Sequence, residues 1–308
     1  MTDTFGTSIV QDHVIDHLRR NGRASYSSIA EELGLTRSSV SEIIKSVVDS
    51  GQLRFTASVN PRMFGFKVEG HLHVVLRGDA ATLYDEMVAS PLTTYVSTTT
   101  GEAGLCIQVR CRFETELVEL LSSIRRHTEV LAIRVHRYEN IEHNIYAPTL
   151  QAEEQSTLDE TDMRLIETLE QDGRAPVRVL AEALGLPESS VRHRMTRLID
   201  GEIIRVVAVP QRDFGRAYTF ALGLGIRHTG DSHAGVAALT RLGVAFFATT
   251  TGDFGIIATA VFNTLREAND FTDALRSESW VVGLASWMHL QILKEDYSVA
   301  AYRDTRQR

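Results

Sequence analysis

The chain has 308 residues, 43% of them hydrophobic, and a formal net charge of -8. It is long enough for two or more domains with cores of their own, and no run approaches the roughly 18 apolar residues of a membrane span. The acidic balance argues against non-specific coating of nucleic acid, so a nucleic-acid partner would have to meet a local basic surface. The first residues lack the basic-then-apolar layout of an export signal, and Cys106 and Cys111 are the only cysteines. We therefore expect free thiols in a cytoplasmic protein.

The N-terminal part of the chain predicts three helices followed by a strand. The helices cover residues 8–20, Ser27–Leu33 and Thr36–Asp49, and Thr36 has the side chain of an N-cap. The strand, Gln52–Val59, is expected to form a short wing. Helix, turn and helix in this order is the arrangement of a helix-turn-helix domain.

From Lys67 the hydrophobic period changes, and the chain predicts strands and helices in the order βαββαβ. The predicted elements are Val68–Leu76, Ala80–Ala89, Thr93–Thr100, Leu105–Cys111, Glu114–His127 and Val130–Tyr138. This order is the ferredoxin-like plan.

A second helix-turn-helix domain is predicted within Asp172–Arg205. Its first helix, Val177–Leu184, is closed by Gly185, and its second helix begins at Pro187 and runs to Asp200. Apolar residues with helical spacing predict one buried stripe on this second helix, formed by Val191, Met195, Leu198 and Ile199. The opposite face offers short donors and cations, the chemistry that meets base edges and phosphates. A solvated helix in an ordinary bundle is the alternative.

The sheet pattern then returns in the last third of the chain. The predicted elements are Tyr218–Ile226, Ser232–Leu242, Ala245–Thr251, Ile256–Phe262, Leu265–Ser277 and Val281–Leu293. A polar, acidic segment, Gln151–Thr157, is expected to link the two halves of the chain.

The chain repeats itself with an offset of 151 residues, from Gly22 to Gly173. Over Gly22–Val40 this offset gives 11 identities in 19 positions, and the turn Thr98–Gly104 returns as Thr249–Gly255. Phe64-Gly65 matches Phe214-Gly215 when one residue is dropped. A period this long indicates a duplicated two-part unit and not a solenoid.

The second half resembles the Lrp/AsnC family of bacterial transcription regulators. The resemblance rests on Leu158-Asp159 with Asp162, on the segments DGRA, LAEALGL and ESSVRHRMTRL, and on the IIR that follows. The sheet segments, each with a threonine-glycine (TG) turn, are similar to the regulatory domain of that family. The resemblance implies that the helix-turn-helix binds DNA, that the sheet domain pairs subunits, and that a small molecule, often an amino acid, binds near the TG turn.

We therefore predict an α+β protein in which a winged helix-turn-helix domain and a ferredoxin-like βαββαβ domain are duplicated as an internal pseudo-dimer. The expected domains are a degenerate winged helix-turn-helix (1–60), a regulatory domain (61–147), a linker (148–157), a second winged helix-turn-helix (158–211) and a second regulatory domain (212–308). Apolar sheet faces such as Val96–Cys106 and Phe246–Ile257 would need covering, which predicts a homo-oligomer, a dimer or larger.

The two helix-turn-helix domains, here called the first head (residues 1–60) and the second head (158–211), differ in charge. Arg194 and Arg197 occupy positions that are usually basic in the family, whereas the first head has Ile43 and Ser46 there. Glu42 also stands on the exposed face of the first head, where phosphate would repel it. The predicted DNA-binding residues of the second head are Ser189, Ser190, Arg192, His193, Arg194, Thr196, Arg197 and Arg205. Those of the first head are Arg37, Ser38, Ser39, Ser41 and Lys45, and a pairing surface without DNA contacts is its alternative.

The predicted partner is double-stranded DNA, and if both unlike heads bind it, we expect an operator without a clean palindrome. No membrane partner is expected. The predicted function is a sequence-specific DNA-binding transcription regulator controlled by a small-molecule effector.

The TG turns offer a site for that effector, because hydroxyls and free N–H groups beside a glycine can hold a carboxylate. The candidate residues are Thr98, Thr100, Gly101, Glu102, Thr249, Thr251, Gly252 and Asp253. The family usually has an acidic residue three positions after the turn glycine, where this chain has Gly104 and Gly255. A tight strand connection rich in threonine is the alternative.

The sequence predicts no metal site, no cofactor and no catalytic residues. His13 with His17 and His71 with His73 have pair spacing, but neither pair has a third ligand at recognisable spacing, which favours exposed or partly packed histidines. Cys106 and Cys111 fall on opposite faces of one strand and are expected to fill the core.

An enzyme is the rival function. Some proteins similar to this family in fold are sirohaem decarboxylases, which carry a His-Asn-Tyr and Trp-rich segment where this chain has Val244–Thr249. That segment contains no histidine, and Trp287 and His289 of the last strand do not restore the pattern. We therefore predict that the protein is not an enzyme.

Overall fold

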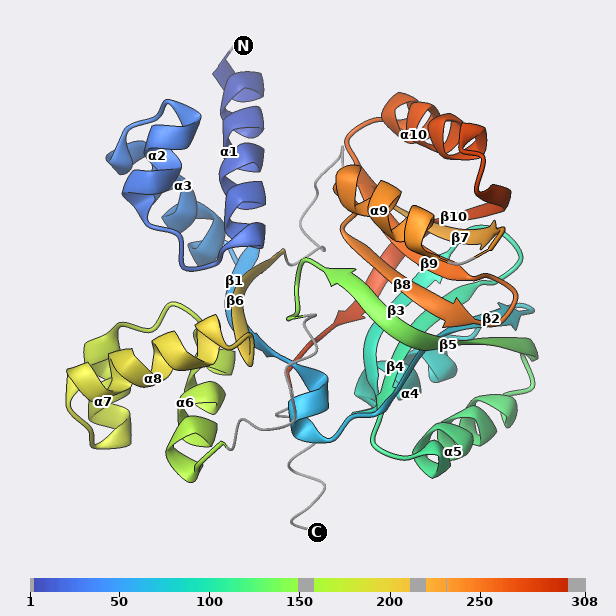
Figure 1. The fold of residues 1–308 in the computed structure, drawn as a ribbon, viewed down its shortest axis with the longest axis horizontal. Coiled ribbons are helices and arrows are strands. Elements are labelled where there is room, and N and C mark those ends of the chain that lie inside the picture. Colours follow the sequence, from blue (N-terminus) through green and yellow to red (C-terminus); the bar gives the residue numbers. More distant parts are fainter. Residues whose placement is uncertain (1–2, 149–157, 211–219, 231, 299–308) are drawn as a thin grey trace. The chain divides into compact units, whose positions relative to one another are not determined.

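The computed structural model describes residues 3–148, 158–210, 220–230 and 232–298. The predicted linker Gln151–Thr157 and the repeat match Phe214-Gly215 lie outside the described residues. The chain divides into two compact units. One unit contains residues 1–63, 145–215 and 297–300, and the other contains residues 64–144, 216–296 and 301–308 (Figure 1).

The first unit holds both helix-turn-helix domains. The first head consists of α1 (Asp3–Arg20), α2 (Tyr26–Leu33), α3 (Arg37–Asp49) and β1 (Leu53–Val59), followed by the short 3-10 helix η1 (Pro61–Phe64). The second head consists of α6 (Glu160–Gln171), α7 (Val177–Leu184), α8 (Glu188–Asp200) and β6 (Ile204–Pro210).

Local signals in the sequence set the helix ends. Ser25 and Thr36 cap α2 and α3 by accepting from the N–H groups of Ser28 and Ser39. Gly34 and Gly185 end α2 and α7 in the left-handed conformation, with φ of 66° and 68°. The two heads therefore share the glycine that ends the first of these helices, whereas α7 and α8 begin at Pro176 and Pro187 without a side-chain cap.

The wings of the two heads pair with each other. β1 and β6 form an antiparallel two-stranded sheet, and the predicted wing is therefore completed by the other repeat. The Gly22 N–H donates to the Val206 carbonyl at 2.9 Å, and the Gly173 N–H donates to the Phe55 carbonyl at 3.1 Å. A Cβ at Gly22 would lie 2.7 Å from the Val206 oxygen, which explains the glycine.

The second unit joins the two predicted ferredoxin-like domains. Its first half consists of β2 (Val68–Leu76), α4 (Ala81–Ala89), β3 (Thr93–Thr99), β4 (Leu105–Cys111), α5 (Glu114–Arg125) and β5 (Val130–Asn144). Its second half consists of β7 (Phe220–His228), α9 (His233–Arg241), β8 (Phe246–Thr251), β9 (Ile256–Phe262), α10 (Leu265–Ser277) and β10 (Val281–Glu295). The predicted fold class is confirmed, duplication included.

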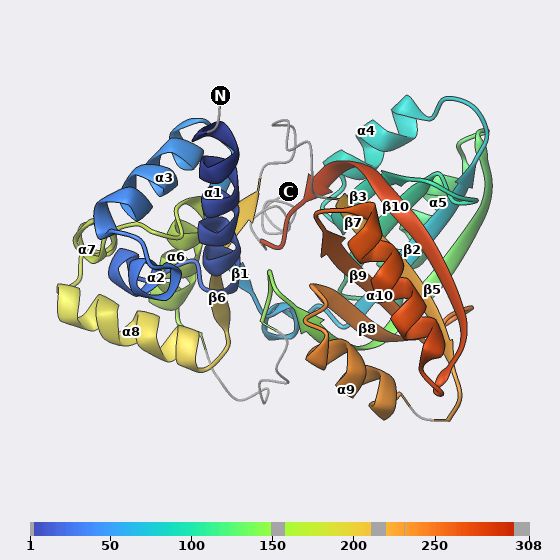
Figure 2. The same cartoon turned by 90° about the horizontal axis from the view of Figure 1, so that it is seen from above.

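The two sheets close into one barrel with the strand order β10-β3-β4-β2-β5-β8-β9-β7. The long strands β5 and β10 each pair with a strand of their own repeat and with one of the other repeat. The helices lie on the outside of the barrel, as Figures 1 and 2 show. They cover two apolar clusters, one around Leu72, Leu83 and Ile107 and one around Leu224, Leu239 and Phe247.

The inner sheet faces line the barrel. Residues of both repeats meet there, in a cluster of Cys106, Phe254, Ile257 and Trp287. The sequence predicted that these apolar sheet faces need covering. In the structure, the barrel formed by the two sheets of this one chain covers them. No helix among the described residues is both long and apolar enough to cross a membrane.

Candidate nucleic-acid interface

The α8 helix divides its residues as its sequence predicts. Val191, Met195 and Leu198 are buried, and Ile199 is half-buried. The side opposite this stripe is solvent-facing: Ser189, Arg192, His193 and Thr196 are exposed, and Ser190 is half-buried. In helix-turn-helix domains it is the exposed face of the second helix that meets the major groove.

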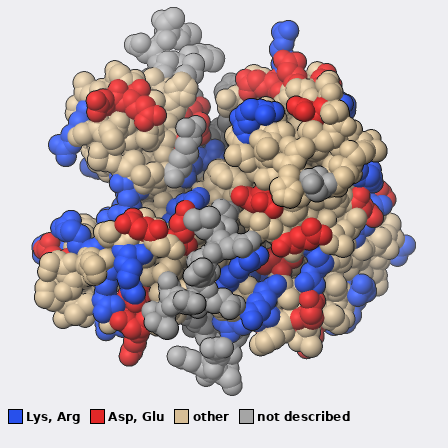
Figure 3. All heavy atoms as spheres, viewed as in Figure 1, with Lys and Arg blue, Asp and Glu red and all other residues tan. Residues whose placement is uncertain are grey.

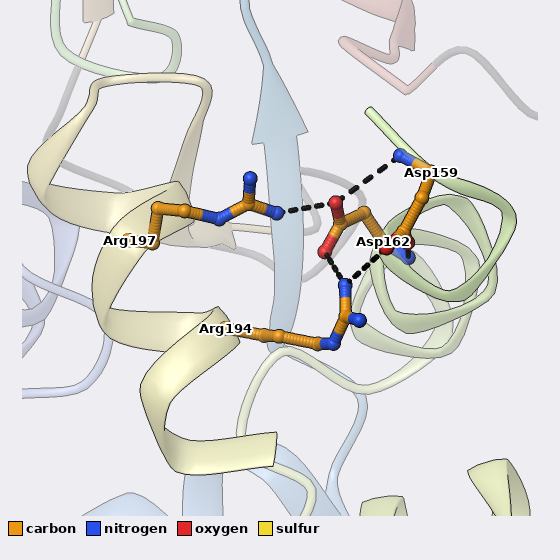
Figure 4. Close-up of polar contacts among 4 residues, drawn as sticks. All are labelled: Asp159, Asp162, Arg194 and Arg197. Carbon is orange, nitrogen blue, oxygen red and sulfur yellow. Dashed lines mark hydrogen bonds and ion pairs between the residues drawn. The ribbon is translucent and has the colours of Figure 1, made fainter. Parts of the chain in front are cut away.

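Arg194 and Arg197 instead reach back to the first helix of the same head (Figure 4). Arg194 donates from Nη1 to Asp159 Oδ2 at 2.7 Å and to Asp162 Oδ1 at 2.8 Å. Arg197 donates from Nη2 to Asp162 Oδ2. The two arginines of the recognition helix therefore hold α8 against the start of α6.

The carboxylate that receives them is inside the domain, since the side chain of Asp162 is 1% exposed. Asp159 and Asp162 also form a capping box at the start of α6. The backbone N–H of Asp162 and the Arg194 guanidinium lower the pKa of Asp159, and the two aspartates raise the pKa of Arg194. Because the aspartates offset the positive charge of Arg194, this arginine attracts a DNA phosphate less strongly than an unpaired arginine would.

Arg205 lies outside this cluster, with Nη2 at 3.9 Å from Glu202 Oε2 and its side chain 29% exposed. Arg192 is 68% exposed, with a long contact of 3.9 Å to Glu188. On the face shown in Figure 3, Lys and Arg alternate with Asp and Glu and do not form one basic field.

The first head presents an equivalent face on α3. Arg37, Ser38, Glu42 and Lys45 are exposed. Two further predicted contact residues, Ser39 and Ser41, are half-buried. The backbone N–H of Ser39 already donates a hydrogen bond to the Thr36 hydroxyl at 3.1 Å, as part of the cap of α3. The α3 face therefore has two exposed cations, Arg37 before Glu42 in the helix and Lys45 after it.

Sequence reasoning missed a pair of arginines in the GRA segments that reveal the duplication. Arg23 donates to the Gly173 carbonyl at 2.7 Å, and Arg174 donates to the carbonyls of Gly22 and Ala24, each at 2.6 Å. Together with Arg37 they line a surface pocket of about 370 Å³ at the start of α2. The repeated Gly-Arg-Ala segment was the signal in the sequence that could have revealed this contact. When two repeats contact each other reciprocally, the contact residue occurs once in each repeat.

The two TG turns meet at one arginine of β5. Arg134 donates to Glu102 at 2.5 Å, and its Nε lies 3.8 Å from Asp253 Oδ2. Gly101 and Gly252 are exposed at the turns, with φ of 91° and 154°. The candidate effector residues of the two repeats are thus brought together, around a cation that the sequence had not singled out.

Most of the turn threonines are occupied within the chain. The Thr100 hydroxyl accepts from the Met288 N–H at 2.9 Å, and the Thr251 hydroxyl donates to Glu139 at 2.6 Å. Thr249 is buried, with its hydroxyl 3.3 Å from Glu142 Oε1. Thr98 is half-buried in the ladder with β10. Among the candidate groups at the turns, Arg134 is the cation that lies between the acids of both repeats, Glu102 and Asp253.

The expectation of exposed or partly packed histidines is wrong for β2. His71 and His73 are buried, and their ligand atoms and that of Cys106 lie within 4.8 Å of one another. Burial lowers the pKa of His71 well below its usual value, lowers that of His73 to about 3, and raises that of Cys106 to about 12. The third ligand-type residue lies on a neighbouring strand, where spacing along the sequence could not reveal it.

Comparisons with known proteins agree with this geometry. The family model described as an AsnC-type helix-turn-helix domain matches residues 158–199, and one described as winged helix-turn-helix DNA-binding matches residues 13–54. The HTH-type transcriptional regulator FL11 of Pyrococcus abyssi is 28% identical over 141 residues, which cover 45% of this chain and 93% of the relative. An uncharacterized HTH-type transcriptional regulator of Pyrococcus furiosus is 30% identical over 121 residues, which cover 37% of this chain and 78% of the relative.

The whole chain is similar in fold to the siroheme decarboxylase NirDL, with a TM-score of 0.60, 14% identity and 97% of each chain covered. That likeness shows the shared duplicated architecture. The paired heads and the regulators they match define the class, helix-turn-helix transcriptional regulators. The chain belongs to the Lrp/AsnC family of these regulators, in a tandem form that carries two copies of the family's domain pair.

Proposed function

We propose that this chain binds double-stranded DNA with both heads and regulates transcription from one asymmetric site. The observation that carries the proposal is the exposed face of α8, where Ser189, Arg192, His193 and Thr196 stand opposite the buried stripe. Short donors can meet base edges, and the cation can meet a phosphate. DNA as the partner also supports a cytoplasmic location.

The first head supports the same role by its own exposed residues. Arg37, Ser38 and Lys45 are exposed on α3, in the positions that the exposed residues of α8 occupy one repeat later. Because the two faces carry different side chains, they are expected to read different half-sites.

Footprinting on the region upstream of the protein's own gene tests this proposal. We expect protection of two half-sites of unlike sequence. A variant with Ser189→Ala and His193→Ala should lose contacts in one half-site, and one with Ser38→Ala and Glu42→Ala should change the other. A perfect inverted repeat under each pair of heads, or no protection above non-specific background, would contradict the proposal.

The effector is proposed to bind where the TG turns meet. Arg134 is 38% exposed and lies between the carboxylates of Glu102 and Asp253. A zwitterionic ligand such as an amino acid would satisfy both charges, with its carboxylate on the arginine and its ammonium on an acid. Calorimetric titration with a panel of amino acids should give heat that disappears in Arg134→Ala.

Arg137→Ala is the control for the strand itself, because Arg137 lies on β5, opposite Thr251 in the ladder, but its guanidinium pairs with Glu114 at 2.6 Å and not with the turn acids Glu102 and Asp253. Equal loss of binding in both variants would mean that the strand was disturbed. Unchanged binding in Arg134→Ala would place the effector elsewhere.

We propose that the chain is a regulator and not a sirohaem decarboxylase, although the fold is shared. The support is the segment Val244–Thr249, which holds no histidine, together with relatives that are named regulators. Absorbance spectra of the purified protein with added sirohaem should show neither a bound pigment nor a product, and a decarboxylated product would overturn this proposal.

Self-association of the chain stays a prediction. Its original reason is weakened, since the inner sheet faces line the intrachain barrel. Light scattering on the protein as it elutes from a size-exclusion column would measure the molar mass of the assembly directly.

A further inference from the structure

The barrel interior gathers ligand-type side chains on one face of three neighbouring strands. In the register of β2 with β4, His73 lies opposite Cys106, and in the register of β2 with β5, His71 lies opposite His136. Side chains two residues apart on a strand share a face, and antiparallel partners have Cβ atoms about 4.5–5.5 Å apart. The backbone therefore brings these residues together independently of side-chain rotamers.

The side chains converge within this frame. The ligand atoms of His71, His73 and Cys106 lie within 4.8 Å of one another. The rings of His73 and His136 are 5.3 Å apart between centroids. All four residues are buried, from 0% exposed for Cys106 and His136 to 5% for His73.

These imidazoles lack the hydrogen bonds that buried polar groups normally have. Both ring nitrogens of His71 and of His136, and Nε2 of His73, are buried without a hydrogen-bond partner in the described part of the chain. Such atoms are uncommon in folded proteins and call for a physical explanation. A metal ion would provide one, because the unprotonated nitrogen of an imidazole is a strong ligand.

We propose that His71, His73 and Cys106 bind one transition-metal ion, Zn²⁺ or Cu⁺, inside the barrel. Thiolate and imidazole ligands select these borderline and soft ions over the oxygen-preferring Mg²⁺ and Ca²⁺. Trp287 packs against His73 with centroids 4.4 Å apart, and Phe254 lies beyond it, so the ligands are enclosed by apolar rings. Ion binding does not depend on the proposed DNA-binding function.

The second cysteine provides an internal control. Cys111 is on the same strand and fully buried, but it packs in the cluster under the helices, on the other face of the sheet. Cys106→Ser and Cys111→Ser thus remove the same group from the same strand, one inside the barrel and one outside it.

Metal content of the reduced full-length protein tests the site. Because the ligand side chains are buried, Zn²⁺ or Cu⁺ is supplied during expression and again by anaerobic dialysis. The metal kept after desalting is counted by plasma mass spectrometry. We expect one ion per chain in the wild type and in Cys111→Ser. Cys106→Ser and His71→Gln should retain clearly less than one ion per chain. Loss of even a residue that only supports a ligand usually lowers metal affinity by at least about 10-fold.

Co²⁺ loading of the wild type gives a second readout that needs no variant, because a Co²⁺–thiolate bond adds a charge-transfer absorption band. Circular dichroism establishes that each variant is folded. No retained ion, a Co²⁺ spectrum without the thiolate band, or equal retention by the two cysteine variants would overturn the proposal. Recovery of a tetrapyrrole in place of the bare ion would also overturn it. Retention of Cu⁺ but not Zn²⁺, or the reverse, would identify the ion.

Discussion

The two heads share a core and differ in how the recognition helix is held against the first helix. In the second head, Arg194 and Arg197 on α8 bind the buried Asp162 of α6. The repeat offset places Ile43 and Ser46 at the arginine positions of the first head, and Gln11 at the aspartate position. The apolar core residues Leu165, Ile166 and Leu169 correspond to Val14, Ile15 and Leu18, and all six are buried.

Both sides of this contact thus changed together between the repeats. Where the arginines are absent, the buried carboxylate is absent as well, because an unpaired buried charge would be strongly destabilising. Arg194 and Arg197, which made the second head look like the stronger DNA binder, are paired with aspartates of their own head. When Arg194 and Arg197 are set aside because they pair with Asp162, the exposed cations that remain are Arg37 and Lys45 on α3 and Arg192 on α8, and the two heads are closer than their sequences suggest.

The largest difference between the heads should appear when the buried acceptor is removed. Asp162→Ala takes away the partner of two guanidinium groups and half of a capping box. We expect a loss of about 2–3 kcal/mol of unfolding free energy, less than for a fully buried pair because Arg194 and Arg197 are partly exposed.

Urea denaturation followed by circular dichroism measures that loss. The matched variant is Gln11→Ala in the first head, where we expect a change within about 0.5 kcal/mol. Equal effects of the two variants would show that the ion-pair cluster adds nothing to the stability of the second head.

A smaller asymmetry is expected where the heads hold each other. Arg174 donates to two carbonyls and lies over the rings of Tyr26 and Phe55, at 5.0 and 4.7 Å from their centroids. Its counterpart in the first repeat is Arg23. Within the described residues, the Arg23 guanidinium donates one hydrogen bond, to the Gly173 carbonyl. We expect Arg174→Ala to cost about 1–2 kcal/mol more than Arg23→Ala. Thermal unfolding of both variants decides this, and a larger effect of Arg23→Ala would contradict it.

The smallest expected difference is a dependence on acid. The pKa of Asp159 is depressed in the folded second head, first by the hydrogen bond from the Asp162 backbone and then by Arg194. The stabilisation is therefore fully present above the unfolded pKa, near 3.8, and is lost as the pH falls through the lower folded value.

Acid titration of the unfolding midpoint should show this loss below about pH 4. It should be reduced in Asp159→Asn. The corresponding position of the first head is Ser8, which does not titrate in this range. An identical acid profile for the wild type and Asp159→Asn would rule out this contribution.

Sequence alone predicted the elements and the duplication, because capping residues, glycines and apolar spacing are local signals. It also predicted the buried stripe and the exposed face of α8, except at Ile199 and Ser190, which are half-buried. It could not place Arg194 against Asp162, since that contact joins two helices and the same arginine could equally have faced phosphate. The group of His71, His73 and Cys106 was missed for a similar reason, because strand register, and not spacing, brings Cys106 to the histidines.

The central claim is that both heads contact DNA through their exposed faces, while Arg194 and Arg197 hold the second head together. The most direct test is the salt dependence of DNA affinity, by fluorescence anisotropy, for the wild type, Arg192→Ala, Lys45→Ala and Arg194→Ala. Each lost phosphate contact lowers the log–log slope by about 0.9. We predict a slope shallower by about 1 for Arg192→Ala and for Lys45→Ala, and an unchanged slope for folded Arg194→Ala. A shallower slope for Arg194→Ala with no change for Lys45→Ala would contradict the claim and leave the second head as the sole reader.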